Sequence, residues 1–162
     1  IQADFGNLSV ISIYIPSGSA KQERQDYKMA FMVKRFMPYL EALQKDGREY
    51  IICGDINIVH KKIDIKNFNG NKNRSGCLPE ERAWLDQLFG EVGFIDAFRE
   101  INQEANQYTW WSNRGQAWAN NTGWRIDYHI LSANLKGTPQ RVEVYKEERF
   151  SDHSPLIIDY DF

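Results

Sequence analysis

Apolar residues follow two different periods along this chain, and the difference predicts its main elements. Between residues 8 and 13 they are closely spaced and mostly β-branched, which is typical of a strand buried among others. Between residues 22 and 45 they recur at steps of three and four, which predicts an amphipathic helix ending before Gly47. Pro38 lies inside that segment and should kink or divide the helix. We expect this helix to cover one face of a sheet.

The second half of the chain also contains patterns typical of a helix and of strands. A proline at the helix start and acids in the first turn predict a helix over residues 79–89. Alternating apolar positions predict strands over residues 124–131 and 140–145, and a turn followed by a final strand occupies residues 149–160. The 162 residues contain no internal repeat, low-complexity segment or interdomain linker. These features predict a single domain that contains both helices and strands.

The most informative stretch is the apolar run over residues 50–60, because it ends in polar groups. A short run of Ile and Cys bounded by Gly indicates a buried strand, and alternation along it directs Asp55 and Asn57 to the same face, about 7 Å apart. A carboxylate and an amide at the mouth of a hydrophobic sheet cost desolvation free energy unless a metal, a water or a phosphate uses them. The alternative is that both residues only cap the following turn, a position that Asp and Asn favour.

A basic loop follows this strand. It holds five basic residues and one acid, Asp64, so it has a local excess of four positive charges although the whole chain has a net charge of −2. Such a loop is most simply a solvated surface. Its position directly after the polar groups, however, suits contact with a phosphate backbone. The basic residues are Lys61, Lys62, Lys66, Lys72 and Arg74.

Tryptophan is concentrated in a single segment. Four of the five tryptophans fall within fifteen residues, with two arginines in or next to the segment and no acid. Aromatic rings interleaved with Arg suit stacking on bases and sugars beside phosphates, although core and rim packing is the alternative, and we expect it for Trp111. The residues are Trp110, Trp111, Trp118 and Trp124 with Arg114 and Arg125.

Composition places the chain among ordinary globular domains, with 42% hydrophobic and 14% aromatic residues. The longest apolar runs are only a few residues, so we expect no membrane span. Cys53 and Cys77 are lone thiols without metal-site spacing, which favours a reduced, cytoplasmic protein over a disulfide scaffold. The net charge argues neither for nor against nucleic acid, because a mean hides local patches.

Polar residues recur in five short segments whose order and neighbours form a specific set. The chain resembles the exonuclease III family of bacterial DNA-repair nucleases from about Leu8 to its C-terminus. That resemblance implies a DNase I-like α/β sandwich of two packed sheets flanked by helices, with this chain as the C-terminal part of the domain. The segments are Tyr14-Ile15-Pro16-Ser17-Gly18, Gly54-Asp55-Ile56-Asn57, Pro79-Glu80-Glu81-Arg82, Trp124-Arg125-Ile126-Asp127-Tyr128 and Ser151-Asp152-His153-Ser154-Pro155.

The resemblance also implies roles for individual residues. His153 matches the catalytic histidine and Asp127 the carboxylate that orients it, while Asp55 matches the residue that positions or activates the attacking water. Which group takes the proton stays open. Tyr14 and Asn57 match contacts to the scissile phosphate, and Asp152 with Asp55 match a site for Mg²⁺ or Mn²⁺. The residues expected to contact DNA are Lys61, Lys62, Lys72, Arg74, Trp110, Trp124 and Arg125.

The activity implied is Mg²⁺-dependent removal of nucleotides from 3′ ends of duplex DNA and incision on the 5′ side of abasic sites, in base-excision repair. The family's metal-binding Glu and a further site Asn precede the matched region, so we expect this chain to be one piece of a longer protein, monomeric when complete. Alone it should bind Mg²⁺ weakly and turn over slowly or not at all. The alternatives are a phosphatase of the same fold acting on phosphoinositides or phospholipids, and a DNA-binding module without catalysis.

Overall fold

The computed structural model describes residues 1–19 and 21–162 and is built around a five-stranded sheet in the order β1-β2-β3-β7-β4. Strands β2 and β3 are parallel, and the other neighbours are antiparallel. The strands expected near residues 8–13 and 50–55 are confirmed, whereas β1 was not predicted. The bounds are β1 (Gln2–Phe5), β2 (Leu8–Tyr14), β3 (Glu49–Asp55), β4 (Ile95–Asp96) and β7 (Asp127–Leu131).

Both faces of the central strand β3 are covered, which explains its uninterrupted apolar run. Ile52 packs with the helices on one face, and Ile51 packs in a second cluster on the other. Gly54 is required near the end of this strand, because its φ is 149° and a Cβ there would lie 1.8 Å from the carbonyl oxygen of Ile13. The close approach lets β2 and β3 stay in register up to the polar residues.

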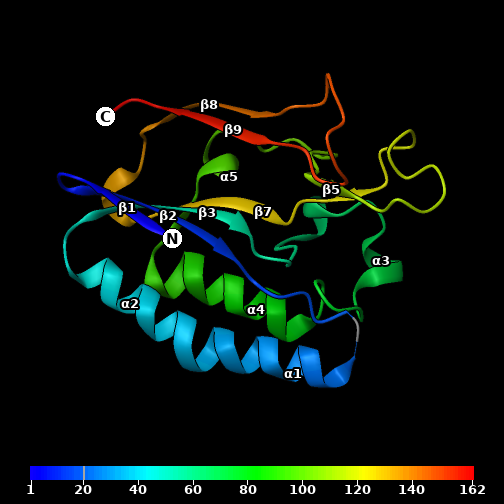
Figure 1. Ribbon diagram of the computed structural model, residues 1–162, viewed down its shortest axis with the longest axis horizontal. Helices are drawn as coiled ribbons and strands as arrows, with labels where there is room; N and C mark the ends of the chain where they lie inside the picture. The colour runs from blue at the N-terminus through cyan, green and yellow to red at the C-terminus, as the bar shows by residue number, and fades with distance from the viewer. Residues whose placement is uncertain (20) are drawn as a thin grey trace.

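Helices cover one face of the sheet, as Figure 1 shows. The predicted helix over residues 22–45 is divided as expected: a π-helical turn separates two α-helices, and Pro38 is the second residue of the latter. The predicted helix over residues 79–89 is also present and continues into another π-helical turn. The bounds are α1 (Gln22–Phe31), η1 (Met32–Phe36), α2 (Met37–Lys45), α4 (Pro79–Gln87) and η3 (Leu88–Val92).

A short helix and a two-stranded antiparallel sheet cover the opposite face (Figure 1). Their cluster includes Leu131 and Leu135, with Ile158 and Tyr160 packed against it. The layering confirms the predicted α/β arrangement of packed sheets flanked by helices. These elements are α5 (Ala97–Ile101), η4 (Ala133–Leu135), β8 (Pro139–Val144) and β9 (Leu156–Tyr160).

Short elements gather where β2, β3 and β7 meet the polar residues. The predicted strand over residues 124–131 is interrupted, because Arg125 and Ile126 leave the ladder between β6 and β7. Trp111 is 1% exposed, so the prediction of a core role is confirmed. The elements here are η2 (Lys62–Asp64), α3 (Phe68–Asn71), β5 (Trp110–Trp111) and β6 (Gly123–Trp124).

In the described part of the chain, no helix combines the length and the apolar character needed to cross a membrane. Cys53 and Cys77 are both free thiols.

Candidate active site

The register of the three central strands sets three polar residues in one row. Tyr14 at the end of β2 lies opposite Asp55 of β3, and Asp55 lies opposite Asp127 at the start of β7. Residues paired across neighbouring strands direct their side chains to the same face. The sheet therefore brings together a phenol and two carboxylates that are far apart in sequence.

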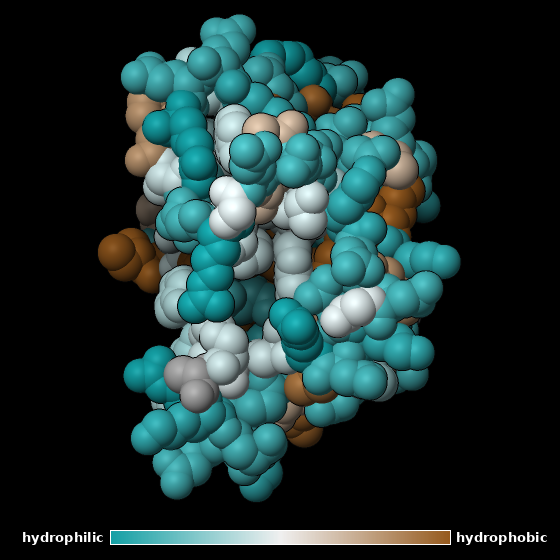
Figure 2. All heavy atoms as spheres, turned by 90° about the vertical axis from the view of Figure 1, so that its right-hand side faces the viewer, coloured by the Kyte–Doolittle hydropathy of each residue, from teal (hydrophilic) through white to brown (hydrophobic). Residues whose placement is uncertain are grey.

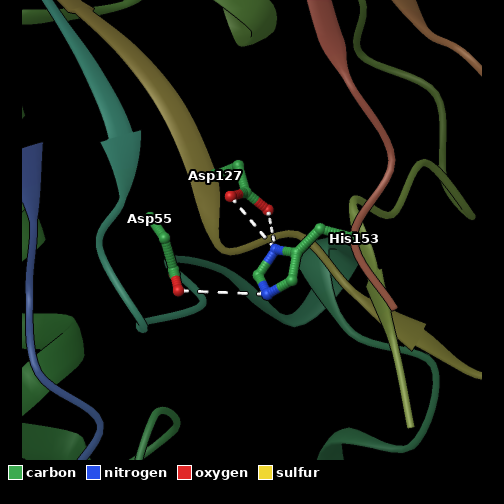
Figure 3. A group of neighbouring side chains, drawn as sticks. All are labelled: Asp55, Asp127 and His153. Atoms are coloured by element: carbon green, nitrogen blue, oxygen red, sulfur yellow. Dashed lines mark hydrogen bonds and ion pairs between the residues drawn. The ribbon is translucent and has the colours of Figure 1, made fainter. Parts of the chain in front are cut away.

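His153 approaches this row from the turn before β9. A bridge to Trp110 and a hydrogen bond of 2.8 Å from the N–H of Ser154 to the carbonyl of Thr109 hold the turn against β5. The Nδ1 atom of His153 lies 2.9 Å from Oδ2 of Asp127, and its Nε2 atom lies 4.0 Å from Oδ2 of Asp55. Figure 3 shows the imidazole between the two carboxylates. The arrangement fixes the ring and directs Nε2 towards Asp55.

Burial and charge shift the pKa values of this group. Burial raises the pKa of Asp55 to about 6, and the nearby Asp127 carboxylate adds to the rise. The hydrogen bond to Asp127 raises the pKa of His153 above its usual range, against the effect of burial. The raised pKa of Asp55 allows this carboxyl to hold or exchange a proton near neutral pH, and the raised pKa of His153 favours its charged form.

Asn57 follows β3 in a left-handed backbone conformation with φ 55°, so the extended geometry expected to place it about 7 Å from Asp55 on the same face ends before this residue. Its N–H donates to Oδ1 of Asp55 at 2.8 Å, and its side-chain Nδ2 donates to Oδ2 of Asp55 and to the carbonyl of Ile15, each at 2.8 Å. Asp55 does cap this turn, as the simpler interpretation of the sequence expected, and it also belongs to the cluster. Because both amide hydrogens of Asn57 have partners, one must be released before Asn57 donates to a phosphate.

The row opens into a groove of about 1030 Å³. Trp110 and Trp124, in edge-to-face contact with ring centroids 6.0 Å apart, line one side of it. Figure 2 shows a largely hydrophilic face with a hollow bordered by residues of intermediate hydropathy at this end of the molecule. Other lining residues are Tyr14, Asp55, Asn57, His153, Arg74 and Arg114. A groove with aromatic walls and basic rims fits a bulky phosphate-containing ligand.

One group of acidic and histidine side chains in the described residues has donor atoms close enough to hold a metal ion. The donors of Asp55, Asp127 and His153 all lie within 4.8 Å of one another. Asp152, expected from the resemblance to bind the metal, lies outside this group and accepts a hydrogen bond of 3.0 Å from Nε1 of Trp110. The two carboxylates supply the hard oxygen donors that Mg²⁺ or Mn²⁺ prefers.

The residues expected to contact DNA differ in exposure: Trp110 and Trp124 are half-buried, and the others are exposed except Arg125. Lys61, Lys62, Lys72 and Arg74 are exposed, and Arg74 lines the groove. Lys61 also pairs with Asp86 on helix α4.

Arg125 was wrongly expected to contact DNA. Its side chain is 0% exposed, because the guanidinium pairs with Asp64 at 2.8 Å and with Asp96 at 2.6 Å and lies over the ring of Tyr128. The guanidinium of Arg99 also pairs with Asp64, at 2.7 Å. The single acid of the basic loop is therefore a buried structural residue.

Sequence reasoning missed several residues around the groove. Lys21 lines it and is exposed but was assigned no role, and Arg114, noted only as part of the tryptophan segment, also lines it and is exposed. Gln25 and Lys28 lie on the buried stripe of α1, one or two turns before Met32, and Lys28 pairs with Glu81. Two polar residues that continue an apolar stripe were the signal available in the sequence.

Known proteins resemble this chain closely. A model described as the endonuclease/exonuclease/phosphatase family matches residues 13–153. An exodeoxyribonuclease of Bacillus subtilis is 36% identical over 96% of this chain and 61% of the relative. The DNA repair nuclease APEX1 of Danio rerio is 37% identical over 98% of this chain and 50% of the relative. The chain thus spans about half to three fifths of the length of these two relatives.

Solved structures agree with these relatives. An AP endonuclease from Archaeoglobus fulgidus superimposes with a TM-score of 0.88 at 25% identity, over 99% of this chain and 64% of that one. A 3′-5′ exonuclease from Neisseria meningitidis gives the same TM-score, identity and coverage. The expected DNase I-like fold is confirmed. The match to the family model and the fold together show that this chain belongs to the endonuclease/exonuclease/phosphatase family.

Proposed function

We propose that this chain forms the C-terminal part of a metal-dependent DNA-repair nuclease. Its reactions are removal of nucleotides from 3′ ends of duplex DNA and hydrolysis of the phosphodiester on the 5′ side of abasic sites. The observation that carries the proposal is the row of Tyr14, Asp55 and Asp127, with His153 held over it at the mouth of the groove. The names of the relatives support DNA as the substrate.

Proton transfer follows from the hydrogen bonds of the site. The raised pKa of His153 favours its charged form, in which both ring nitrogens carry a proton. Nδ1 then donates to Asp127, and Nε2 donates to a phosphate oxygen and stabilises the negative charge of the transition state. Asp55, in the middle of the row, orients the attacking water and accepts its proton. Tyr14 is 63% exposed at the end of the row, so its phenol can donate to another phosphate oxygen.

The metal requirement rests on the donor set. Asp55 and Asp127 would hold the ion, with Asp152 joining if its carboxylate leaves the indole of Trp110. A bound Mg²⁺ or Mn²⁺ supplies positive charge that neutralises the phosphate and the leaving oxygen. The chain's own residues orient the phosphate and the water, and they hold the protons.

Duplex DNA suits the surroundings of the site better than a compact headgroup does. Trp110 and Trp124 offer flat rings for an extruded abasic sugar, and the exposed Arg74 lines the groove where a flanking phosphate would pass. Lys62 and Lys72 are exposed cations of the same basic loop. A phosphatase acting on soluble phosphate esters or phosphoinositides needs neither feature. Preference for abasic duplex over such esters separates the two functions.

The test uses the complete protein that carries this chain and a duplex oligonucleotide with one abasic analogue. We expect incision beside the lesion with Mg²⁺, no incision with EDTA, and a rate reduced about 10²- to 10⁴-fold in His153→Ala. His60→Ala is the matched control, because His60 pairs with Asp86 outside the cluster. Intact duplex with Mg²⁺ and wild-type protein would reject nuclease function, and retained DNA binding in that case would favour a module without catalysis.

A further inference from the structure

A buried polar network joins helix α1 to the loops that form one wall of the groove. Glu81, in the first turn of α4, is 0% exposed and uses both carboxylate oxygens. Its Oε1 accepts from Nζ of Lys28 at 2.7 Å and from Nε2 of Gln25 at 3.0 Å. Its Oε2 accepts from the N–H groups of Gly76 at 2.6 Å and Leu78 at 3.0 Å. The carboxylate therefore ties three segments of the chain to one point.

Lys28 is also 0% exposed, so the pair is entirely removed from water. Desolvation of two charges can exceed their mutual attraction, and an apolar pair of similar volume is often as stable. The ion pair is therefore not explained by stability alone. Its remaining contacts suggest what else it does.

Lys28 reaches the active site through its second hydrogen bond. Its Nζ donates to the carbonyl oxygen of Asn57 at 2.9 Å. The N–H of Asn57 is held by Asp55, so both peptide groups that flank this left-handed residue are fixed. A non-glycine residue at positive φ persists only where its surroundings hold it, because that conformation is strained. The hydrogen bonds that Asn57 makes with Lys28 and Asp55 keep it in this conformation.

Glu81 fixes the neighbouring wall of the groove. The N–H of Gly76 donates to Oε2 of Glu81, and this glycine has φ 88°. It packs so closely that a Cβ at this position would lie 3.1 Å from the carbonyl oxygen of Asn57 and 3.1 Å from Cζ3 of Trp124. The carbonyl of Gly76 accepts from the N–H of Val59 at 2.8 Å, which ties the loop to the segment after Asn57. One buried carboxylate thus sets the distance between the asparagine turn and a tryptophan of the groove.

We propose that Lys28 and Glu81 are positioning residues of the active site. The pair holds the Asn57 turn and the Gly76 loop so that Asp55, Asn57 and Trp124 meet the substrate in one geometry. Neither residue touches the substrate, since both side chains are buried. The kinetic part of this inference rests on the proposed nuclease function, whereas its conformational part does not.

The conformational test is amide hydrogen exchange in the complete protein with Lys28→Met, which keeps the length of the side chain and removes its charge. We expect exchange at the Asn57 amide to accelerate about 10- to 100-fold, the effect of losing a hydrogen bond from a charged donor. The amides of Ile51 and Ile52 in β3 should keep their protection. Unchanged exchange at Asn57, or equal acceleration throughout β3, would overturn the proposal.

The kinetic test compares the same variant with one that is only structural. Ser132→Ala is the control, because Ser132 is buried and its Oγ accepts from the N–H of Tyr50 at 2.8 Å at the opposite end of β3. With both variants folded, we expect kcat on the abasic duplex to fall about 10²-fold in Lys28→Met with little change in KM, and to stay at the wild-type value in Ser132→Ala. Lys28→Arg should restore most of kcat, since it keeps the charge and the donors.

The outcomes separate the two proposals. A wild-type protein that does not cleave DNA rejects the nuclease function, and hydrogen exchange at Asn57 then decides the positioning role alone. A wild-type protein that cleaves, with Lys28→Met equally active, rejects the positioning role alone. If Lys28→Met does not fold, Glu81→Gln takes its place with the same expected results, because the amide keeps the volume and one acceptor oxygen.

Discussion

Asp55 and Asp127 lie directly opposite each other in the register of β3 and β7, and the repulsion between their carboxylates contributes to the raised pKa of Asp55. Two acids on adjacent strands at one face are unfavourable unless a cation or a proton compensates them. Here His153 lies between them and compensates in part. The register therefore stores electrostatic strain at the site where catalysis is proposed, and its effects can be measured.

The first prediction concerns the stability of the folded chain without metal. The folded-state pKa of Asp55, about 6, lies above its ordinary value of 3.8, so the folded state binds more protons between these values and stability falls as pH rises from about 4 to 6. Asp55→Asn removes this loss. In EDTA at pH 7.5 we expect the variant to be more stable than wild type by about 1–3 kcal/mol.

Urea unfolding at pH 4 and pH 7.5 checks this prediction, because the difference between the two proteins should be much smaller at pH 4. The variant should lose nuclease activity at both values. If Asp55→Asn proved less stable than wild type at pH 7.5, the assignment of strain to this carboxylate would be contradicted.

The second prediction concerns Asp127 and the charge of His153. The hydrogen bond to Asp127 is the largest cause of the raised pKa of His153, and burial opposes it. In Asp127→Asn we therefore expect the pKa of His153 to fall to its ordinary value of 6.5 or below, and kcat to fall about 10²-fold at neutral pH. NMR titration of the ring protons measures the pKa. His60 in the same spectra is the internal control, since it pairs with Asp86 rather than Asp127.

The third prediction separates phosphate contact from structural charge. Arg74 is exposed and lines the groove, so Arg74→Ala should weaken DNA binding and reduce the slope of log K against log salt by about 0.9. Lys136→Ala removes an exposed charge directly after η4, which follows the end of β7 opposite Asp127, and should leave the slope unchanged. Equal slopes for all three proteins would remove Arg74 from the DNA-binding surface.

The fourth prediction concerns the buried cluster around Arg125. Oδ1 of Asp64 accepts from the guanidinium groups of Arg99 and Arg125, and the side chain is 1% exposed. Asp64→Ala leaves a buried cation short of a partner, so we expect the free energy of unfolding to fall by about 3–5 kcal/mol. Asp86→Ala, which breaks the exposed pair with Lys61, should cost less than about 1 kcal/mol. Similar losses in the two variants would contradict the structural role of Asp64.

The fifth prediction concerns metal binding by the chain alone. Among the described residues, Asp55 and Asp127 are the carboxylates of the group that could hold a metal ion, and Asp152 lies outside it. We expect micromolar Mg²⁺ to raise the free energy of unfolding by less than about 0.4 kcal/mol, because a weak site has a dissociation constant above that concentration. Thermal unfolding of residues 1–162 over a Mg²⁺ titration measures the gain. A large increase at micromolar Mg²⁺ would show that these residues suffice to hold the ion.

The sequence by itself determined much of the candidate site. The apolar run before Gly54 predicted a buried strand, and its two-residue period correctly placed Asp55 at the end of β3. Short polar motifs pointed to Tyr14, Asp127 and His153, which the structure brings to one place. These predictions succeeded because strand alternation and motif chemistry are local properties of a chain.

Tertiary structure alone decided which charged residues face the solvent. Arg125 follows a groove tryptophan in sequence but pairs with Asp64 and Asp96 in the interior, so the sequence could not reveal its burial. Lys28 and Glu81 are 53 residues apart and become partners only when α1 and α4 pack on the same face of the sheet. The physical reason is that the cost of a buried charge depends on partners brought by distant elements, and local sequence does not contain them.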